Sequence, residues 1–509
     1  MLRRVFSAAN AIFFAHLIVR LGALFLVPLY LKYWPASLYG EYLALFAAVS
    51  YFASLDIGMQ QAAINRMTKA YAKGDFEEYK SVQHTALAFY LVLAIAGTCL
   101  AAAVFQVVPV SQWIGLKLTT PSTARFVLIL LAAYLVGSMP MRLIGATYQT
   151  MGNLARSQWI ANAQQILVVI LCAAVILFGG GIVAIASVQL LTVPLVLGVV
   201  LLELWRRYPA YLPGVTHARL SVLKELAHPS LLFALLLVAN LIAYQGSTLL
   251  VSATIGSLAV VVLSVSKAII DVVRQALYSI TLALCPEFAR MQALGQMEEL
   301  RRTHRMIVAA TSAITLALAA DVWYEGPQII TLWTHGRVEP DTMLLRLFLI
   351  LLVLQTPWAA SSTVATATNR HQAQAVGYFV AALAGIGAIT ALVPYLDTWA
   401  VPVGLVLGEA LGCYHFVIKA TCRMIGEPYA AFATRFWLGL GAVGATVLAT
   451  AAIVHYSIPG LTLVRWGVMG VLTFTVGAIC AWWVWLTPDD RTVLRPKLRP
   501  VLRLSSVRA

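Results

Sequence analysis

Charged residues are rare inside the long apolar stretches of this sequence, and those that occur there could bind an ionic ligand. The clearest group is Lys267, Asp271 and Arg274, within the apolar stretch 258–285. Their i, i+4, i+7 spacing puts all three on one face of a helix. Asp271 can neutralise only one of the two cations, so the face keeps about one unit of positive charge. Since a guanidinium binds phosphate with two parallel hydrogen bonds, an anionic ligand is indicated. The alternative is a self-satisfied ion cluster that fixes helix packing.

Two further ionisable residues lie in the first two apolar stretches. Arg20 lies midway along the first, and Asp56 lies in the second within Ser54-Leu55-Asp56-Ile57-Gly58. An ionisable group at mid-membrane is costly and normally faces a cavity or a partner. We expect Arg20 to line a cavity, with a structural partner such as Asp56 as the alternative. Asp56 either acts in function or bends the helix beside Gly58.

Neutral polar side chains are candidates for hydrogen bonds to the same ligand. Asn240 and Gln245, with Tyr244 between them, could bind a polar ligand or pack between helices. Asp56 and Asp271 are the acids expected to take part in any coupling to an ion gradient. Other acids lie toward the ends of their apolar stretches and are not predicted as proton sites: Glu203, Asp321 and Glu409.

The elements that must position these residues are membrane-spanning helices. Of the 509 residues, 61% are hydrophobic and only 11% charged, so most of the outer surface must face lipid. A bilayer core needs about 20 apolar residues per helix, and runs this long exclude barrel strands. We therefore predict an all-α integral membrane protein of about 14 transmembrane helices. The predicted ranges are 8–31, 39–63, 82–108, 122–146, 157–178, 182–205, 229–253, 258–285, 306–324, 342–366, 374–394, 400–419, 436–456 and 464–486.

The distribution of lysine and arginine predicts the orientation. With a cytoplasmic N-terminus, about 25 of the 35 Lys and Arg residues fall in cytoplasmic segments and four in external ones. This asymmetry places both termini in the cytoplasm. The net charge of +15 is spread over many loops, which argues against a nucleic-acid-binding protein. These residues instead set topology and contact anionic membrane lipids. The six cysteines are expected to be free thiols.

An internal repeat divides the chain. The segments 69–83 and 290–304 match at an offset of 221 residues, including Gly74 with Gly295. Six helices lie between corresponding points, which predicts two six-helix lobes in parallel repeat with substrate sites between the halves. The predicted organisation is an N-terminal lobe, a cytoplasmic linker, a C-terminal lobe, two additional transmembrane helices and a basic cytoplasmic tail: 1–205, 206–228, 229–419, 420–486 and 487–509.

The first 80 residues carry motifs of a known transporter family. Val27-Pro28-Leu29 closes the first stretch, Tyr39-Gly40-Glu41-Tyr42 opens the second, and Leu55-Asp56-Ile57-Gly58 follows. With Asn65 and the charged helix 69–80, this resembles the start of polysaccharide flippases. These form the polysaccharide transporter branch of the multidrug/oligosaccharidyl-lipid/polysaccharide exporter superfamily. In the second lobe, Leu258 to Leu263 does not reproduce the Tyr-Gly pair.

The resemblance implies a bacterial inner-membrane protein that flips undecaprenyl-pyrophosphate-linked oligosaccharides to the periplasmic leaflet by alternating access. The glycans would serve lipopolysaccharide or exopolysaccharide synthesis, with a polysaccharide polymerase and glycosyltransferases as partners. Arg20, Lys267 and Arg274 would contact pyrophosphate or acidic sugars. The sequence contains no P-loop, HExxH or CxxC motif, so we predict no cofactor, no metal site and no enzymatic activity.

Two alternatives remain open. One is a cation-coupled multidrug exporter of the same fold, although such a protein would favour an acidic cavity. The other is a membrane-embedded enzyme of glycan assembly. The nearest catalytic candidates for an enzyme are the residues of one short external loop: His335, Arg337, Glu339 and Asp341.

Overall fold

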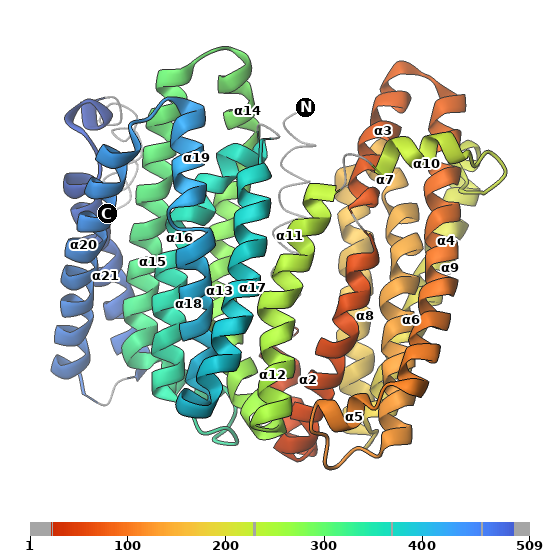
Figure 1. Cartoon of the computed structure of the whole chain (residues 1–509), viewed down its shortest axis with the longest axis horizontal. Helices are drawn as coiled ribbons and strands as arrows, with labels where there is room; N and C mark the ends of the chain where they lie inside the picture. The colour runs from red at the N-terminus through yellow and green to blue at the C-terminus, as the bar shows by residue number, and fades with distance from the viewer. Residues whose placement is uncertain are drawn as a thin grey trace. The chain divides into compact units, whose positions relative to one another are not determined.

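The computed structural model describes residues 22, 24–56, 58–227, 231–367, 370–459 and 462–492. This part of the chain is almost entirely helical and contains no β-strand, which confirms the predicted all-α fold (Figure 1). Eleven helical stretches among the described residues are long and apolar enough to span a membrane. The count of fourteen stays a prediction.

The chain forms two compact units. Unit 1 comprises Met1–Val265, Thr331–Glu339 and Ile389–Thr398, and unit 2 comprises Ser266–Ile330, Pro340–Ala388 and Trp399–Ala509. Helices α13 (Ser257–Ala283), α15 (Met297–Trp333) and α17 (Gln372–Leu396) contribute to both units. The predicted boundaries of the lobes, linker and tail stay a prediction.

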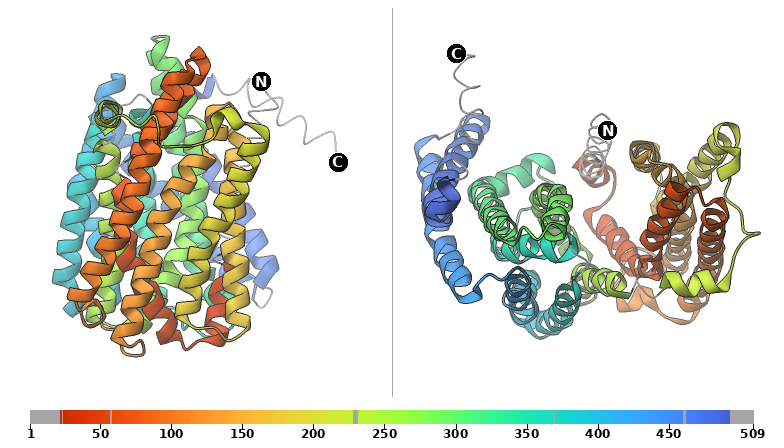
Figure 2. Two further views of the ribbon diagram at one scale, coloured as in Figure 1. Left: turned by 90° about the vertical axis from the view of Figure 1, so that its right-hand side faces the viewer. Right: turned by 90° about the horizontal axis from the view of Figure 1, so that it is seen from above.

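Unit 1 is built on long helices that run side by side (Figures 1 and 2). Helix α4 packs on α6, α6 packs on α9, and α8 packs on α9, while α2 covers α6. The helices of unit 1 are Leu24–Tyr33, α2 (Ala36–Ser50), α3 (Met59–Lys73), α4 (Phe76–Val107), α5 (Val110–Trp113), α6 (Pro121–Gly145), α7 (Thr147–Thr150), α8 (Leu154–Leu177), α9 (Ile182–Arg207), α10 (Leu220–Ala227), α11 (Leu231–Leu241) and α12 (Ser247–Thr254). Two 3₁₀ segments, η1 (Tyr51–Asp56) and η2 (Pro209–Tyr211), and a π-helix, η4 (Ile242–Gly246), connect them.

Polar caps fix where these helices begin. The Asp75 carboxylate accepts a hydrogen bond from the Glu78 amide at the start of α4. Asn153 does the same for α8. Thr120 caps α6, whose first residue is Pro121. Each cap satisfies an amide that the first turn would leave unpaired. The predicted starts at 122 and 157 lie close to those of α6 and α8, whereas the predicted start at 82 comes well after Phe76, the first residue of α4.

A buried carboxylate anchors a loop of unit 1. Glu41 on α2 is completely buried. Its two oxygens accept three backbone hydrogen bonds, from Lys117 (2.6 Å), Leu118 (2.7 Å) and Thr119 (2.8 Å). Charged acceptors make the stronger hydrogen bonds of proteins, and each would be expensive to lose inside the fold. Glu41 therefore fixes the loop between α5 and α6 onto α2.

Unit 2 contains the remaining helices. They are the rest of α13, then α14 (Cys285–Ala293), α15, α16 (Thr342–Ala367), α17, α18 (Ala400–Gly412), α19 (Phe416–Ile425), α20 (Tyr429–Ser457) and α21 (Thr462–Val484), with the 3₁₀ segment η5 (Asp397–Trp399) between α17 and α18. Helices α20 and α21 lie against each other, and α16 contacts α14, α18 and α19. Figure 2 shows α20 and α21, in blue, running alongside each other.

Small residues let α17 and α18 pack closely. A Cβ atom added to Gly412 would lie 2.1 Å from the Gly377 carbonyl oxygen, and one added to Gly408 would lie 2.2 Å from the Ala381 oxygen. The contact positions recur every four residues, on one face of each helix. Such stripes of small residues allow backbone approach where no hydrophobic effect drives helices together in lipid.

Ionic contacts attach the last two helices to α15. At one end of α15, buried Glu325 accepts from Arg465 Nη2 (2.6 Å), His455 Nδ1 (2.7 Å) and Trp466 Nε1 (2.8 Å). Nearer the middle, the Asp321 carboxylate accepts from the Thr473 hydroxyl at 3.0 Å. Helices α20 and α21 are thus held to α15 by polar contacts within the apolar region.

A second ionic cluster lies at the other end of α15. The Arg305 guanidinium contacts Glu427 (2.9 Å) and Asp490 (3.0 Å), and Arg302 also contacts Asp490 (3.3 Å). Burial would raise the pKa of Asp490, but hydrogen bonds from Arg305 and Thr487 outweigh it and hold that pKa below its ordinary value. The carboxylate therefore stays ionised and fixes the segment after α21.

The internal repeat is visible in backbone detail. Gly74 ends α3 with a positive φ of 72°, and Gly295 follows α14 with a φ of 70°. The amide of Asp75 donates to the carbonyl of Ala70, and the amide of Gln296 donates to that of Met291, at the same offset of 221. Both glycines provide the left-handed residue that terminates a helix. The two segments therefore share one local backbone geometry, and the parallel repeat of two lobes stays a prediction.

Candidate functional site

The charged face predicted on stretch 258–285 exists on α13. Arg274 Nη1 lies 2.8 Å from Asp271 Oδ1, and both side chains are half-buried. Lys267, one turn before Asp271, is also half-buried, and the Asp271 charge acts on it. The three side chains therefore form one interacting group, as their spacing predicts. Whether this group binds a ligand stays a prediction.

Helices α16 and α18 of unit 2 enclose another carboxylate within the apolar region. Glu409 on α18 is buried, and its oxygens accept hydrogen bonds from the Gln355 side-chain amide and from Trp358 Nε1, the latter at 2.9 Å. Glu409, Gln355 and Trp358 therefore form a buried polar group between α16 and α18.

Sequence reasoning placed Glu409 toward the end of its apolar stretch, although residue 409 lies midway along the predicted span 400–419. The predicted span was 400–419, whereas the helical stretch continues through α19 to Ile425. A short turn at 413–415 separates α18 from α19 without ending the stretch. Glu409 therefore lies well inside, where its neighbours are other helices. The sequence does contain two hydrogen-bond donors within the apolar stretch 342–366, Gln355 and Trp358, and such donors indicate that a buried acceptor lies nearby.

Asp56 lies at a break in the second apolar stretch of unit 1. Helix α2 ends at Ser50, η1 follows, and Gly58 has a φ of 71° before α3 begins. The Asp56 carboxylate accepts a hydrogen bond from the Tyr90 hydroxyl of α4. The helical stretch that could span a membrane ends at Asp56, before the predicted end at 63, and the chain bends beside Gly58 as in the structural alternative given for Asp56. A functional role for Asp56 stays a prediction.

Asn240 lies just before the π-helix η4 in unit 1, and Gln245 lies within it. Asn240 is exposed and Gln245 is half-buried. The segment η4 packs on α2, and the preceding helix α11 packs on η1, where Tyr51 donates to the Leu241 carbonyl at 3.4 Å. Short π-helical segments inside membrane helices are frequent at functional sites. The sequence pattern did not predict this one. Arg20 lies outside the described residues.

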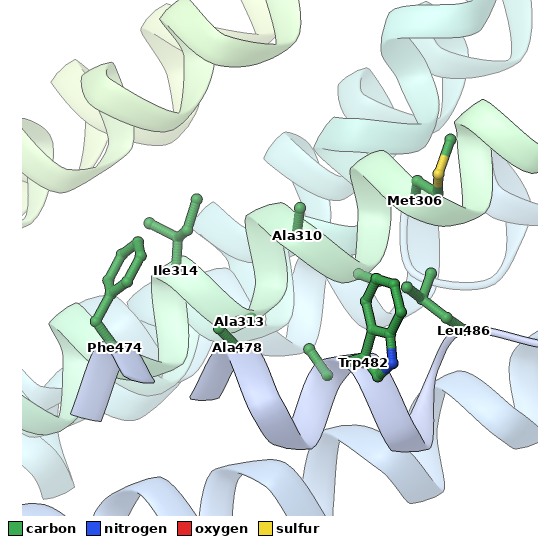
Figure 3. Close-up of a pocket in the computed structure, with 10 residues that line it drawn as sticks. Met306, Ala310, Ala313, Ile314, Phe474, Ala478, Trp482 and Leu486 are labelled. Atoms are coloured by element: carbon green, nitrogen blue, oxygen red, sulfur yellow. The ribbon is translucent and has the colours of Figure 1, made fainter. Parts of the chain in front are cut away.

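An apolar pocket of about 380 Å³ lies between α15 and α21 in unit 2 (Figure 3). Met306, Ile314, Phe474 and Trp482 are among its ten lining residues, and none of the ten is charged. Such a lining suits hydrocarbon and offers little to a phosphate group. The pocket is thus different in character from the charged cluster.

The loop considered for an enzyme makes structural contacts. Within unit 1, Arg337 Nη1 donates to the Leu31 carbonyl at 2.7 Å. Within unit 2, Asp341 accepts from the Leu344 amide at the start of α16 and from Trp399 Nε1, both at 2.9 Å. Among the described residues, no group of three His, Cys, Asp or Glu side chains could hold a metal ion.

Comparisons with solved structures identify the fold. A lipid II flippase MurJ in an inward closed conformation superposes with a TM-score of 0.73 over 92% of this chain and 97% of that one, at 11% identity. A multidrug resistance MATE family transporter of the MOP superfamily, inward-facing, gives a TM-score of 0.65 over 82% and 93%, at 16% identity. Its outward-facing conformation gives 0.60 over 82% and 95%. No family model and no curated protein matches the sequence. The chain therefore has the fold shared by the MurJ flippase and the MATE transporters.

Proposed function

We propose that this protein is a flippase that moves undecaprenyl-pyrophosphate-linked oligosaccharides from the cytoplasmic to the periplasmic leaflet by alternating access. The observation that carries the proposal is the charged face of α13, with Lys267, Asp271 and Arg274 in a helix of 27 residues that has the length of a membrane span but is not among the eleven apolar stretches found above. Charges at this depth normally face a cavity or a ligand. A guanidinium and an ammonium together suit a pyrophosphate group.

The fold also supports the proposed transport of a lipid-linked substrate. Lipid II, named for the MurJ neighbour, is a lipid-linked substrate, and such a substrate needs polar contacts for its head and lipid for its tail. The proposed head-group contacts are Lys267, Asp271 and Arg274, joined by Arg20, Asn240 and Gln245. The tail would stay among membrane lipids.

The remaining parts of the proposal follow from the sequence. The protein would lie in the bacterial inner membrane with both termini in the cytoplasm, as the Lys and Arg asymmetry indicates. Its product would feed lipopolysaccharide or exopolysaccharide synthesis, beside a polymerase and glycosyltransferases. It would perform no covalent chemistry and need no cofactor. Asp56 and Asp271 are the acids proposed from the sequence for ion coupling.

A multidrug exporter is the second candidate, favoured by the MATE transporters among the structural neighbours. Its substrates would be organic cations. The cationic side chains Lys267 and Arg274 on α13 disfavour such a ligand, because like charges repel in a region of low dielectric.

The test is leaflet translocation of a fluorescent undecaprenyl-pyrophosphate oligosaccharide in proteoliposomes. Arg274→Gln and Lys267→Met remove one cation each, and Arg20→Ala tests the residue outside the described part. Arg125→Ala is the matched control, because within the described part of the chain this exposed arginine of α6 donates a side-chain hydrogen bond to Gln106 of α4 alone (3.3 Å). Transport lost in the α13 variants and kept in the control supports the proposal. Equal transport in all of them would reject the α13 site, and no wild-type transport would reject the function.

A further inference from the structure

Two prolines affect the backbone carbonyls of the first described helix of unit 1, Leu24–Tyr33. In an α-helix each carbonyl accepts from the amide four residues later, and proline has no N–H to donate. Pro28, inside the helix, stands four residues after Leu24, and Pro35, just beyond its end, stands four residues after Leu31. These two carbonyls therefore have no amide donor at the usual helical position. Because they are seven residues apart, they lie on the same side of the helix.

Both carbonyls accept hydrogen bonds from the end of α15. Trp333 Nε1 donates to the Leu24 carbonyl at 2.7 Å. Arg337 Nη1 donates to the Leu31 carbonyl at 2.7 Å and to the Lys32 carbonyl at 3.1 Å. A guanidinium suits this position, since the C-terminal end of a helix carries partial negative charge. The donors thus pair with the acceptors that the prolines leave available.

The turn after α15 directs Arg337 toward the first helix. The helix α15 ends at Trp333, and the next turn contains two residues with positive φ, His335 (52°) and Gly336 (70°). The amide of Gly336 donates back to the Thr331 carbonyl at 2.8 Å. Left-handed residues of this kind end a helix and redirect the chain. The loop considered above for catalysis therefore has a structural task, which is to present the Arg337 guanidinium to Leu24–Tyr33.

The helix that accepts these bonds is fixed within the predicted N-terminal lobe, residues 1–205. The rings of Tyr30 and Tyr39 stack with their centroids 5.0 Å apart. Trp34 Nε1 donates to the Gly180 carbonyl at 3.1 Å. These contacts join the end of the first helix to later parts of the same lobe. The acceptor carbonyls are therefore expected to move with that lobe.

The donors Trp333 and Arg337 come from the other half of the predicted repeat, residues 229–419. By the predicted topology their loop lies on the external side of the membrane. Alternating access requires the two lobes to part on one side at a time, so a contact that joins them externally has to break when that side opens. Trp333 is half-buried and Arg337 is exposed. Water can therefore replace both donors, and the helix keeps its own hydrogen bonds when they leave.

We propose that Trp333 and Arg337 form an external latch, which stabilises the closed external side of the protein and releases when that side opens. The external latch consists of the bonds from Trp333 to Leu24 and from Arg337 to Leu31 and Lys32. This inference rests on the proposed function, because alternating access is part of it, and it names residues that set the balance between the two states. A charged donor makes the stronger hydrogen bond, so Arg337 contributes more than Trp333.

The test measures the distance between two spin labels by double electron–electron resonance in the full-length protein, in nanodiscs and without substrate. p-Acetylphenylalanine carrying a nitroxide replaces Phe178 and Tyr395, which are 91% and 83% exposed and lie in the two predicted lobes at external turns. Opening of the external side adds a population at longer distance. Arg337→Met should raise the ratio of the longer to the shorter population about tenfold. Trp333→Phe, which keeps an aromatic ring, should raise that ratio roughly 2- to 10-fold.

The matched control is Trp34→Phe, which also removes an indole hydrogen bond to a backbone carbonyl, but one within the predicted N-terminal lobe. This variant should keep the wild-type distance distribution. An unchanged distribution in Arg337→Met and Trp333→Phe, or an equal shift in Trp34→Phe, would overturn the inference. If one latch variant fails to fold, the other decides. If wild type transports no lipid-linked oligosaccharide, the proposed function fails, and the distances measured without substrate still decide the external latch.

Discussion

The attachment of the last two helices to α15 gives a prediction whose magnitude follows from the contacts. Glu325 is 2% exposed and Arg465 is 6% exposed. Arg465→Met removes the only arginine that contacts Glu325 among the described residues and leaves a buried carboxylate with His455 and Trp466 as donors. Removing one partner of a buried ion pair typically costs about 3–5 kcal/mol, because the other charge is left uncompensated. We expect the free energy of unfolding to fall by that amount.

A double variant separates this cost from lost packing. Adding Glu325→Gln to Arg465→Met removes the orphaned charge, so the double variant should be more stable than Arg465→Met alone. The assay is SDS-induced unfolding in mixed micelles, followed by tryptophan fluorescence, since Trp466 bonds directly to Glu325. A double variant as unstable as the single one, or a single-variant loss below about 1 kcal/mol, would refute the reasoning.

Three further predictions concern stability in the same assay. Gly412→Ala should destabilise the protein because its Cβ would lie 2.1 Å from a backbone oxygen of α17, whereas Gly387→Ala, with nothing within 4 Å, should be near neutral; similar losses in both would contradict the close packing. Glu41→Ala should cost about 3 kcal/mol or more, since three buried amides lose a charged acceptor, and a loss within the ±0.5 kcal/mol of surface substitutions would contradict the anchoring role. Because the folded pKa of Asp490 is lowered, its stabilisation is present above about pH 4 and is lost as pH falls through the folded pKa. Asp490→Asn should therefore be less stable than wild type at pH 7 and lose less stability on acidification, and an identical acid profile in both proteins would reject this.

The features that were predictable from the sequence are those that depend on local spacing along the chain. The i, i+4, i+7 pattern of Lys267, Asp271 and Arg274 depends only on helix geometry, and the structure has that face. Gly74 and Gly295 mark the repeat because a helix end that needs a positive φ selects glycine. Long apolar runs locate helices because lipid permits no unpaired backbone.

Features that depend on contacts between helices were not predictable in this way. The Glu409 carboxylate accepts its hydrogen bonds from Gln355 and Trp358, which lie about 50 residues away in the sequence. Glu41 was assigned only a motif position, whereas its role is set by a loop more than 70 residues later. The π-helix η4 has no hydrophobic period of its own within a uniformly apolar stretch. Such features require knowledge of which helices are neighbours.

The central claim is that the ligand is an anionic, lipid-linked diphosphate. The most direct measurement is transport by wild-type proteoliposomes of two fluorescent substrates side by side, an undecaprenyl-pyrophosphate oligosaccharide and a lipophilic organic cation. We predict leaflet translocation of the first and none of the second. Transport of the organic cation alone, under imposed proton and sodium gradients, would contradict the account and favour the multidrug exporter.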